Sequence, residues 1–222
     1  MKSNDSISSH DNSAADYDRQ AVEYDWIGPE VLFGLAYEYI QPGESLLDIG
    51  IGTGLSSVLF HKAGLRVFGM DGSSEMLKVC ESKRFTNELK RHDLLSCPLP
   101  YPSDFFNHVI SLAVFHFFGD LEPVFEEVAR IIKKGGIFGF SVEVHKPGRQ
   151  DGYASHKGDD ISERIDKDWG VRMFSHSEDY IEKLLHRNGF SVLKKPRFAA
   201  LKYPSSDEVF VLKIFIAQRG KS

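Results

Sequence analysis

The most constraining feature of this chain is an apolar run that ends in an acidic residue and glycines at alternate positions, Leu46-Leu47-Asp48-Ile49-Gly50-Ile51-Gly52-Thr53-Gly54. Glycine at every second position raises the entropy cost of folding, so such a loop indicates positive φ angles or close approach of the main chain to a bound molecule. We therefore predict a strand that turns tightly into a helix, over about residues 55–64, around a ligand. The free amides and the positive dipole at the start of that helix would face the ligand.

Short apolar runs alternate with helical patterns along most of the chain. The predicted strands are 46–49, 66–70, 89–92, 107–112, 137–144, 190–194 and 209–216, and the predicted helices are 14–26, 31–40, 55–64, 73–81, 121–132 and 177–188. This alternation implies βαβ units, and hence a doubly wound α/β fold with a mainly parallel seven-stranded sheet and helices on both faces. The connection between the last two strands has no helical pattern, so we expect them to pair antiparallel at the sheet edge.

A length of 222 residues suits one domain, which we place at residues 14–222. Residues 1–13 are rich in Ser, Asn and Asp and are predicted to be mobile. Residues 14–41 form a predicted N-terminal helical cap. The polar segment 145–173 breaks the alternation, and we interpret it as an inserted lid or binding loop.

Charge and cysteine usage limit the classes of function. A formal net charge of −5 provides no broad cationic field, which disfavours a large nucleic-acid footprint and favours a small-molecule partner. Cys80 and Cys97 match no metal-ligand spacing or disulfide framework, so a reducing compartment, the cytoplasm, is expected. No apolar run reaches the roughly 18 residues of a membrane span. The oligomeric state is not determined by these features.

The glycine loop does not fit the dinucleotide fingerprint G-x-G-x-x-G. The third glycine of that pattern would fall at Leu55, which disfavours a dehydrogenase. The loop matches D-x-G-x-G-x-G instead, with Asp48 as the acid at the end of the strand. Such a loop suits a ligand whose polar chain lies across main-chain amides without a pyrophosphate in the turn.

Two further acids stand at the ends of predicted strands. Asp71 ends the second strand about 20 residues after the glycine loop, where an open sheet places a carboxylate against a ribose. Asp93 ends the third strand, where a carboxylate accepts a hydrogen bond from an exocyclic amine such as that of adenine. A helix cap or a turn acid is the alternative interpretation of each residue.

Five segments together resemble a class I S-adenosylmethionine-dependent methyltransferase, of the small seven-strand type that acts mostly on small molecules. They read LLDIGIGTG, VFGMDGSSEML, RHDL, HVISLAVFHFF and ARIIKKGGIFGFS. The resemblance covers residues 14–144, and residues 173–216 by layout alone. It implies S-adenosylmethionine as the cofactor and in-line transfer of its methyl group to a small-molecule acceptor, with catalysis mainly by positioning.

The resemblance also assigns cofactor-binding residues by position. They are Asp48, Gly50, Gly52, Thr53 and Gly54 around the methionine moiety, Asp71, Gly72 and Met76 along the ribose and adenine, Asp93 and Leu94 at the adenine, Ser111 and Leu112 beneath the sulfonium, and Tyr17 and Tyr24 in the cap. For the two tyrosines, packing of an amphipathic helix is the alternative interpretation.

The chain departs from this family in two places. Asn107 stands where members often have Asp, and Phe117 follows His116 where many members have a second histidine. His116 is therefore a weak catalytic candidate, and the catalytic residue stays unassigned. A protein that binds S-adenosylmethionine without turnover is the alternative function.

The acceptor pocket is expected outside the carboxyl ends of the strands, beneath the N-terminal helices and the insert. The substrate-binding candidates are His116, His145, Tyr153, Trp169 and Arg172, with Glu143, His156 and His176 nearby in the sequence. Aromatic side chains with Arg172 suit a mid-sized acceptor that is aromatic or partly anionic. The histidine spacings match no standard zinc pattern, so no metal is predicted.

Overall fold

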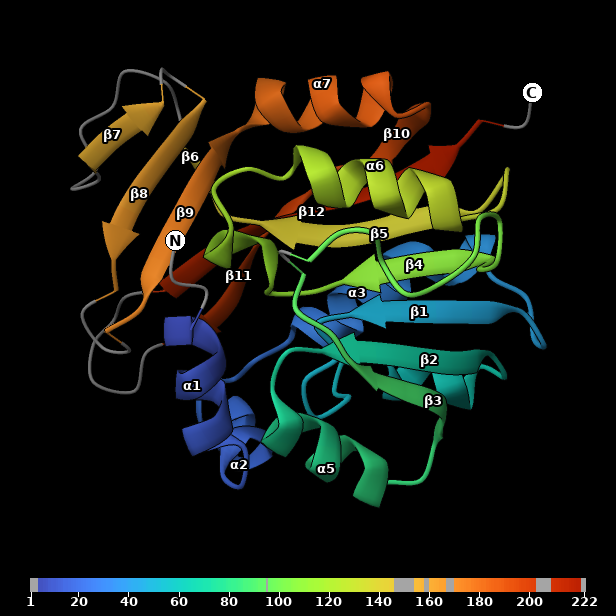
Figure 1. Cartoon of the computed structure of the whole chain (residues 1–222), viewed down its shortest axis with the longest axis horizontal. Coiled ribbons are helices and arrows are strands. Elements are labelled where there is room, and N and C mark those ends of the chain that lie inside the picture. The colour runs from blue at the N-terminus through green and yellow to red at the C-terminus, as the bar shows by residue number, and fades with distance from the viewer. Residues whose placement is uncertain are drawn as a thin grey trace.

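The computed structural model describes residues 4–94, 96–145, 154–157, 160–166, 170–202 and 209–220. The strands of the main sheet are β1 (Ser45–Ile49), β2 (Arg66–Asp71), β3 (Thr86–Arg91), β4 (His108–Ser111), β5 (Ile137–Val142), β10 (Phe190–Lys194), β11 (Arg197–Lys202) and β12 (Val209–Arg219). Their order is β10-β12-β5-β4-β1-β2-β3, and β11 pairs with β12. Strands β1 to β5 run parallel, so their carboxyl ends meet along one edge (Figure 1).

Helices lie on both faces of this sheet (Figure 1). They are α1 (Asn4–Ser13), α2 (Tyr17–Glu23), α3 (Gly28–Ala36), α4 (Val58–Lys62), α5 (Ser74–Ser82), α6 (Glu122–Ile131) and α7 (Glu178–Arg187), with the 3₁₀ turns η1 (Tyr37–Tyr39) and η2 (Phe115–Phe117). Within the described residues, every helix is too short or too polar to cross a bilayer.

Alternate residues of β1 enter two separate cores. Leu47 and Ile49 pack in the core on the side of α6 and α7, whereas Leu46 packs in the core on the side of α3 and α4. A strand that is buried along its whole length is expected in the middle of a parallel sheet, because helices cover both of its faces. The glycine loop therefore follows a strand that is fully buried.

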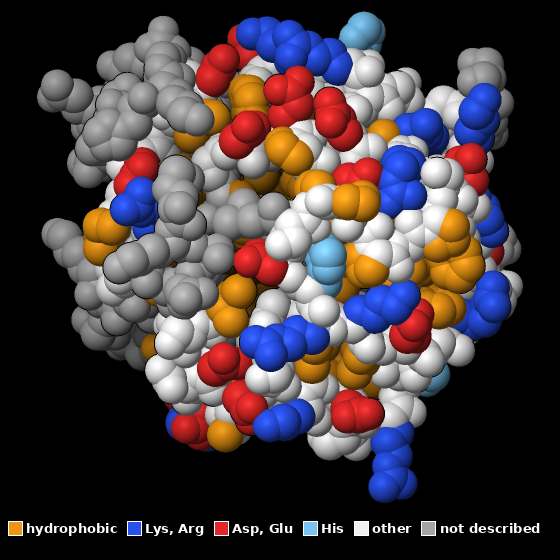
Figure 2. All heavy atoms as spheres, viewed as in Figure 1, with side chains coloured by type: hydrophobic (Ala, Val, Ile, Leu, Met, Phe, Trp, Pro, Cys, Tyr) orange, Lys and Arg blue, Asp and Glu red, His pale blue; other side chains and the backbone are white. Residues whose placement is uncertain are grey.

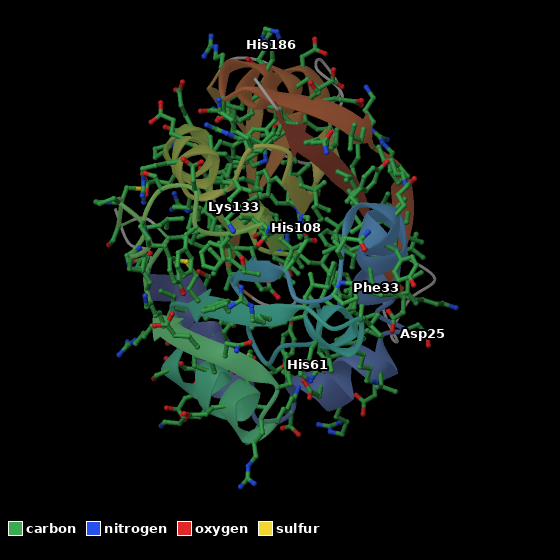
Figure 3. All side chains as sticks on the ribbon, turned by 90° about the vertical axis from the view of Figure 1, so that its right-hand side faces the viewer. Asp25, Phe33, His61, His108, Lys133 and His186 are labelled. Carbon is green, nitrogen blue, oxygen red and sulfur yellow. The ribbon has the colours of Figure 1, made fainter. Side chains whose placement is uncertain are left out.

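The amino-terminal ends of the strands are held by polar contacts far from the glycine loop. The Asn107 side-chain oxygen accepts hydrogen bonds from the Ser45 amide at 3.1 Å and the Ser45 hydroxyl at 2.9 Å. His108 and Lys133 lie at this end (Figure 3), and His108 Nε2 is 2.7 Å from the Glu44 carboxylate. The Asn107 departure from the family pattern therefore lies in a structural contact at the opposite end of the sheet.

The predicted antiparallel pairing of the last strands is confirmed. Strand β10 pairs antiparallel with β12, and β12 also pairs antiparallel with β5. Strand β11, which the sequence pattern does not predict, pairs with the first half of β12. The long β12 therefore carries β10 and β11 one after the other along its outer side.

The insert of residues 145–173 is not simply a loop. A second sheet, in the order β6-β9-β8-β7, contains β6 (Val144–His145), β9 (Arg172–Ser177), β8 (Ile161–Ile165) and β7 (Ala154–Lys157). Backbone groups can pair in strands even where the side chains are polar, so the polar composition of this segment did not indicate that it contains strands. The rest of this insert lies outside the described residues.

The N-terminal segment is also more ordered than its composition indicates. Helix α1 covers most of residues 1–13, which were predicted to be mobile, and it packs beside α5. The Asp11 carboxylate accepts hydrogen bonds from the Ser73 hydroxyl at 2.5 Å and the Glu75 amide at 3.3 Å. Ile7, Asp11 and the buried Ala14 lie on one face at helical spacing, a pattern diluted by the surrounding polar residues.

Helix α4 is shorter than predicted. It begins at Val58 instead of Leu55, and the residues between Gly54 and Val58 form turns. The Ser57 hydroxyl binds a buried carboxylate and does not cap the helix. Within the glycine loop, the amides of Gly50 and Ile51 donate to the Met70 carbonyl, that of Gly52 to the Asp71 carboxylate and that of Gly54 to the Ile51 carbonyl.

Charged side chains of both signs are interspersed over the face shown in Figure 2. On the described part of that face, neither sign forms a continuous field. This distribution agrees with the small formal net charge of −5.

Candidate functional site

Two adjoining cavities lie at the carboxyl ends of the parallel strands. The loop cavity has a volume of about 90 Å³, and its sheet side is lined by Gly50, Gly52, Asp71, Gly72, Met76, Asp93, Leu94, Leu112 and Val114. The aromatic cavity has a volume of about 280 Å³ and is lined mainly by residues of α1, α2, η2, β11 and β12. The residues that line both cavities are His10, Tyr17, Ala113 and Phe117.

The glycine loop exposes its main chain to the loop cavity. Gly50 and Gly52 have φ angles of 73° and 54°, in the left-handed region that other residues rarely adopt. A Cβ on Gly50 would lie 2.4 Å from Val114 Cγ2, whereas a Cβ on Gly52 would meet no described atom within 4 Å. Gly50 is thus required by packing, and the space beside Gly52 is open for a ligand.

Asp71 is held by backbone amides at the mouth of the loop cavity. One oxygen accepts from the Gly52 N–H and the other accepts from the Ser73 N–H, both at 2.8 Å. An ionised carboxylate offers about four acceptor positions, so this arrangement leaves about two for a ligand. Burial raises the pKa of the Asp71 carboxyl, and the two amides oppose that rise. The group is oriented to receive a pair of hydroxyls.

The remaining predicted contacts of the loop cavity come from α5 and the end of β3. The Ser73 hydroxyl accepts a hydrogen bond from the Met76 amide at 3.1 Å and so caps α5, which fixes Met76 against the cavity. Asp93 and Leu94 follow β3 and line the same space. Gly72 lies opposite Ile7 of α1, whose Cδ1 would be 2.7 Å from a Cβ on Gly72.

Asp48 lies below the cavity and does not line it. Its side chain is 1% exposed, and its Oδ2 accepts a hydrogen bond from the Ser57 hydroxyl at 2.6 Å. The other oxygen has no hydrogen-bond partner among the described residues. Burial raises the pKa of this carboxyl to about 7. The structure therefore assigns Asp48 to the support of the loop.

Three other predicted cofactor residues also support the site from outside the cavity. The Thr53 hydroxyl donates to the Asp18 carboxylate of α2 at 2.6 Å. The Ser111 hydroxyl donates to the Ile49 carbonyl at 2.9 Å. A Cβ on Gly54 would lie 2.6 Å from the Phe85 ring, so glycine is needed there for packing. The regular spacing of the motif does not distinguish such residues from those that face the ligand.

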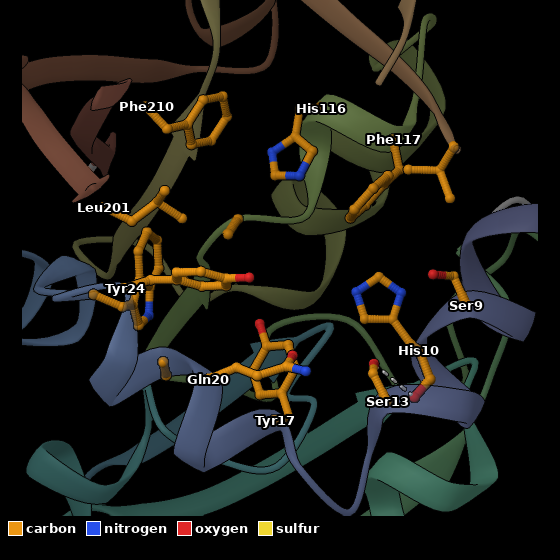
Figure 4. A pocket seen from close by; sticks show the side chains of 14 residues that line it. Ser9, His10, Ser13, Tyr17, Gln20, Tyr24, His116, Phe117, Leu201 and Phe210 are labelled. Carbon is orange, nitrogen blue, oxygen red and sulfur yellow. Dashed lines mark hydrogen bonds between the residues drawn. The ribbon is translucent and has the colours of Figure 1, made fainter. Parts of the chain in front are cut away.

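Aromatic rings surround most of the larger cavity (Figure 4). The His116 ring lies 4.3 Å from the Phe117 ring, and the Phe117 ring lies 5.3 Å edge-on from His10. On the other side, the Phe210 ring is 5.9 Å from His116, again edge-on. The Tyr24 hydroxyl points toward the centre (Figure 4). Tyr24 therefore lines this cavity and not the loop cavity, and its place in a cap over the cofactor stays a prediction.

His116 enters the aromatic cavity as a neutral side chain. It is 3% exposed, and burial lowers the pKa of its imidazole to about 3. Its Nδ1 has no hydrogen-bond partner among the described residues. Arg164, whose charge also lowers this pKa, pairs with Asp166 at 2.7 Å and with Glu143 at 3.1 Å. His116 thus suits hydrogen bonding more than proton storage.

Ala113 lies between the two cavities in an unusual conformation. Its φ is 57°, which costs about 1–2 kcal/mol for a residue other than glycine. The Ala113 amide donates to the Ser141 hydroxyl at 2.8 Å, which holds this turn after β4. A small side chain at this point keeps the boundary between the cavities narrow.

Other substrate-binding candidates lie away from the aromatic cavity or cannot be placed. His145 Nδ1 is 3.0 Å from the Ser175 hydroxyl, and it lines a separate hollow beside the second sheet. Arg172 pairs with Glu163 at 3.1 Å on the surface of that sheet. Tyr153 and Trp169 lie outside the described residues.

The histidines and acids in the described part of the chain form no group that could hold a metal. His176 is buried, and its Nε2 is 3.0 Å from the Gly119 carbonyl oxygen. The side chain of His156 lies outside the described part. His176 is therefore accounted for by a contact within the fold.

Helix α1 supplies cavity residues that sequence reasoning missed. Ser6, Ile7 and His10 line the loop cavity, and His10 also lines the aromatic cavity. Ile7 and His10 are three residues apart and so lie on one helical face, and this spacing was the sequence pattern that could have indicated a packed helix. Phe210 and Leu201 were missed because nothing near them in the sequence connects them with the glycine loop.

Comparison with known proteins points to one family. Residues 47–140 match the model of a methyltransferase domain. A malonyl-[acyl-carrier protein] O-methyltransferase of Serratia marcescens is 31% identical over 134 residues, or 60% of this chain and 51% of that protein. A demethylmenaquinone methyltransferase of Tropheryma whipplei (strain Twist) is 31% identical over 99 residues, 44% of this chain and 41% of that protein. The chain spans about half the length, or less, of these relatives.

Solved structures share the fold along most of the chain. An S-adenosylmethionine-dependent methyltransferase of Methanosarcina mazei has a TM-score of 0.69 at 19% identity and covers 85% of this chain and 98% of its own. The Burkholderia thailandensis 1,6-didemethyltoxoflavin-N1-methyltransferase has a TM-score of 0.68 at 14% identity, with 97% and 88% covered. Residues 47–140, which contain the glycine loop and both strand-end acids, are thus similar to a methyltransferase domain, and the chain shares the fold of these solved methyltransferases.

Proposed function

We propose that this protein binds S-adenosylmethionine in the loop cavity and transfers its methyl group to a small molecule in the aromatic cavity. The observation that carries the proposal is the shared boundary of the two cavities, formed by His10, Tyr17, Ala113 and Phe117. A methyl donor on one side of this boundary and an acceptor on the other would meet without crossing solvent.

The residues of the loop cavity fit the chemical groups of that cofactor. Asp71 keeps acceptor positions for two ribose hydroxyls, since its two amide contacts leave about half of its lone pairs unused. Asp93 and the Leu94 amide at the next strand end suit the adenine edge. The open main chain at Gly52 suits the methionine portion.

Binding also requires helix α1 to move. The loop cavity, at about 90 Å³, is smaller than the roughly 300–1,000 Å³ typical of small-molecule pockets. Ser6, Ile7 and His10 of α1 occupy its outer side. A shift of α1 enlarges this space, and its return covers the bound cofactor and keeps water from the reacting atoms.

The chain contributes mainly alignment to the reaction. Bound S-adenosylmethionine supplies an electrophilic methyl group, so the acceptor's lone pair forms the new bond to carbon while the carbon–sulfur bond breaks and its electron pair stays on sulfur. If the acceptor atom carries a hydrogen, the methylated product loses that proton to water once it leaves the cavity, because burial lowers the pKa of the His116 imidazole to about 3. Phe117 and Tyr17 exclude bulk water from the boundary, and the strained Ala113 turn keeps the path short.

Calorimetry with S-adenosylmethionine and S-adenosylhomocysteine tests the first half of the proposal. We expect both to bind with one site per chain, whereas NAD is not expected to bind. Binding of NAD in place of these two ligands would overturn it. A screen of small acceptors for release of S-adenosylhomocysteine tests the second half.

Cofactor binding without turnover remains the alternative. The observation that favours it is the absence of Asp, Glu and Lys from the described lining of the aromatic cavity, where burial keeps His116 neutral and His10 is the other imidazole. Tight cofactor binding with no acceptor-dependent release above background would support this alternative over methyl transfer.

A further inference from the structure

The aromatic cavity has an unusual combination of properties for a buried binding space. Its described lining includes five side chains with large aromatic rings, Tyr17, Tyr24, Trp26, Phe117 and Phe210, and no Asp, Glu, Lys or Arg. Its polar groups are neutral hydroxyls and an amide, together with two imidazoles. A ligand inside would therefore meet ring faces and hydrogen-bonding groups but no fixed opposite charge.

An ion is costly to bury in such surroundings. A charged group that leaves water needs an ion pair or several hydrogen bonds to recover its hydration energy. Arg172, the sequence candidate for an anionic acceptor, pairs with Glu163 on the second sheet and does not line the cavity. Arg164, whose charge acts on His116, pairs with Glu143 and Asp166, so the described lining supplies no cation for an anionic acceptor.

The shape of the lining favours a flat ligand. The rings of His116, Phe117 and His10 follow one another along one wall, at centroid distances of 4.3 and 5.3 Å. Phe210 and Tyr24 stand across the space from Phe117 and His10 (Figure 4). Aromatic rings stack or meet edge-on at about 4.5–7 Å, so a planar molecule between these walls gains contacts with both sides.

A polar group of the ligand has a defined partner. The His116 ring projects into the cavity, whereas its Nδ1, which has no hydrogen-bond partner among the described residues, is buried against the protein. A polar group of the ligand would therefore pair with the edge of the imidazole that faces the cavity. The volume of about 280 Å³ is at the low end of small-molecule pockets, which are about 300–1,000 Å³.

We propose that the acceptor of this protein is an uncharged, planar ring compound of about two fused rings, held between the aromatic walls with a hydrogen-bonding substituent at His116. This inference rests on the proposed function for the role of the ligand as methyl acceptor. The selectivity of the cavity for uncharged rings does not depend on it.

A matched set of probes tests this selectivity without methyl transfer. Calorimetry at pH 7 would compare 2-naphthol, 2-naphthoate and 2-naphthylmethylammonium, which share one ring system and differ in charge. We expect 2-naphthol to bind at least about tenfold more tightly than either ion, since each ion loses hydration without a fixed counter-charge. Equal or tighter binding of either ion would overturn the inference.

Variants locate the binding and test its cause. Phe210→Ala should weaken 2-naphthol binding at least about fivefold, whereas Tyr37→Ala, which removes a ring that is 61% exposed and outside the cavity, should leave it unchanged. Equal effects of the two variants would overturn the assignment to this cavity. Because loss of Phe210 also removes core packing, a second variant tests the same cavity by adding a charged group instead of removing a ring.

Gln20 lines the cavity from α2 and is only half-buried, so a charged replacement is compatible with folding. Gln20→Lys should supply the missing cation and bring 2-naphthoate to at least the affinity of 2-naphthol. Gln20→Glu, its matched control, should weaken 2-naphthoate and strengthen the ammonium probe. If neither variant alters the order of affinities, the proposed cause of the selectivity is wrong.

These outcomes separate the inference from the proposed function. Selective binding of 2-naphthol by a protein that fails to bind S-adenosylmethionine would overturn methyl transfer and support the cavity's selectivity. Binding of S-adenosylmethionine without a preference among the three probes would overturn the inference alone.

Discussion

The two cavities are built in opposite ways. The loop cavity takes its main contacts from consecutive strand ends, over residues 50–94, and the Gly52 amide there holds the Asp71 carboxylate. The aromatic cavity takes side chains from α1, α2, η2, β11 and β12, which are far apart in the sequence. The loop cavity is thus determined by one continuous part of the chain, whereas the side chains of the aromatic cavity can change independently. Under the proposed function, this difference would let related proteins share a methyl donor and vary their acceptors.

The largest expected effect concerns Asp71, the central acceptor of the loop cavity. Asp71→Ala should weaken S-adenosylmethionine binding by at least about 100-fold, because two charge-assisted hydrogen bonds contribute about 1.5–3 kcal/mol each. Asp93→Ala should cost about tenfold, since one such bond is lost. Calorimetry measures both variants. A loss at Asp93 equal to or larger than that at Asp71 would contradict the assignment of ribose and adenine.

The second effect separates packing from ligand contact within the glycine loop. Gly50→Ala should lower the free energy of unfolding by about 2–4 kcal/mol, because a left-handed φ and a clash with Val114 act together. Gly52→Ala should cost about 1–2 kcal/mol, since only φ is unfavourable.

Denaturant unfolding and calorimetry compare these two glycine variants. We expect Gly52→Ala to lose cofactor affinity out of proportion to its loss of stability, because its methyl group would enter the open space. Similar stabilities of the two variants would show that Val114 yields to the new Cβ. Unchanged cofactor affinity of Gly52→Ala would place the ligand elsewhere.

The third effect concerns the support beneath the loop. The folded-state pKa of Asp48, about 7, lies above its ordinary value of 3.8, so the native fold favours the protonated carboxyl. This contribution to stability is fully present below about pH 4 and is lost as pH rises through 7. Asp48→Asn removes the titration, so its stability relative to the wild type should increase by up to about 1.4 kcal/mol per pH unit over that window.

Unfolding in denaturant from pH 4.5 to pH 8 measures this difference. His116 and His176, whose pKa values are lowered to about 3 and about 4 by burial, oppose the trend of the wild type. They are present in both proteins and cancel in the comparison. A constant difference between the two proteins across this range would mean that Asp48 is ionised in the fold at low pH.

The smallest effect tests helix α1, which contributes to both cavities. Asp11→Ala removes the hydrogen bonds to Ser73 and Glu75, and should weaken the docking of α1 by about 1 kcal/mol, as loss of a helix cap does. Hydrogen exchange of residues 4–13 should then be about fivefold faster in the free protein and should slow when cofactor binds.

Asp16→Ala is the matched control for α1, because Asp16 contacts the exposed Arg19 on the surface. It should leave the exchange of residues 4–13 unchanged. If the Asp11 variant behaves like the control, α1 is held by its apolar contacts alone. The ring contact of His10 with Phe117 and the packing of Ile7 on Gly72 are then the contacts to alter.

The sequence by itself determined the parallel sheet, the antiparallel end strands and the positions of Gly50, Gly52, Asp71 and Asp93 at strand ends. These features are local, because hydrophobic periodicity defines each strand and the parallel order brings the carboxyl ends together. Loop spacing alone also excluded the dinucleotide pattern, at Leu55.

Only the tertiary structure decided which side chains line a cavity. Asp48, Thr53 and Ser111 belong to the same motifs as the cavity residues, yet their side chains bind Ser57, Asp18 and the Ile49 carbonyl, respectively. The aromatic cavity could not be predicted from the sequence. Its rings come from segments that are far apart along the chain, and the order of those segments does not indicate which of them lie close together in the fold. The loop cavity is thus formed largely by one continuous part of the chain, whereas the aromatic cavity forms where separate elements pack together.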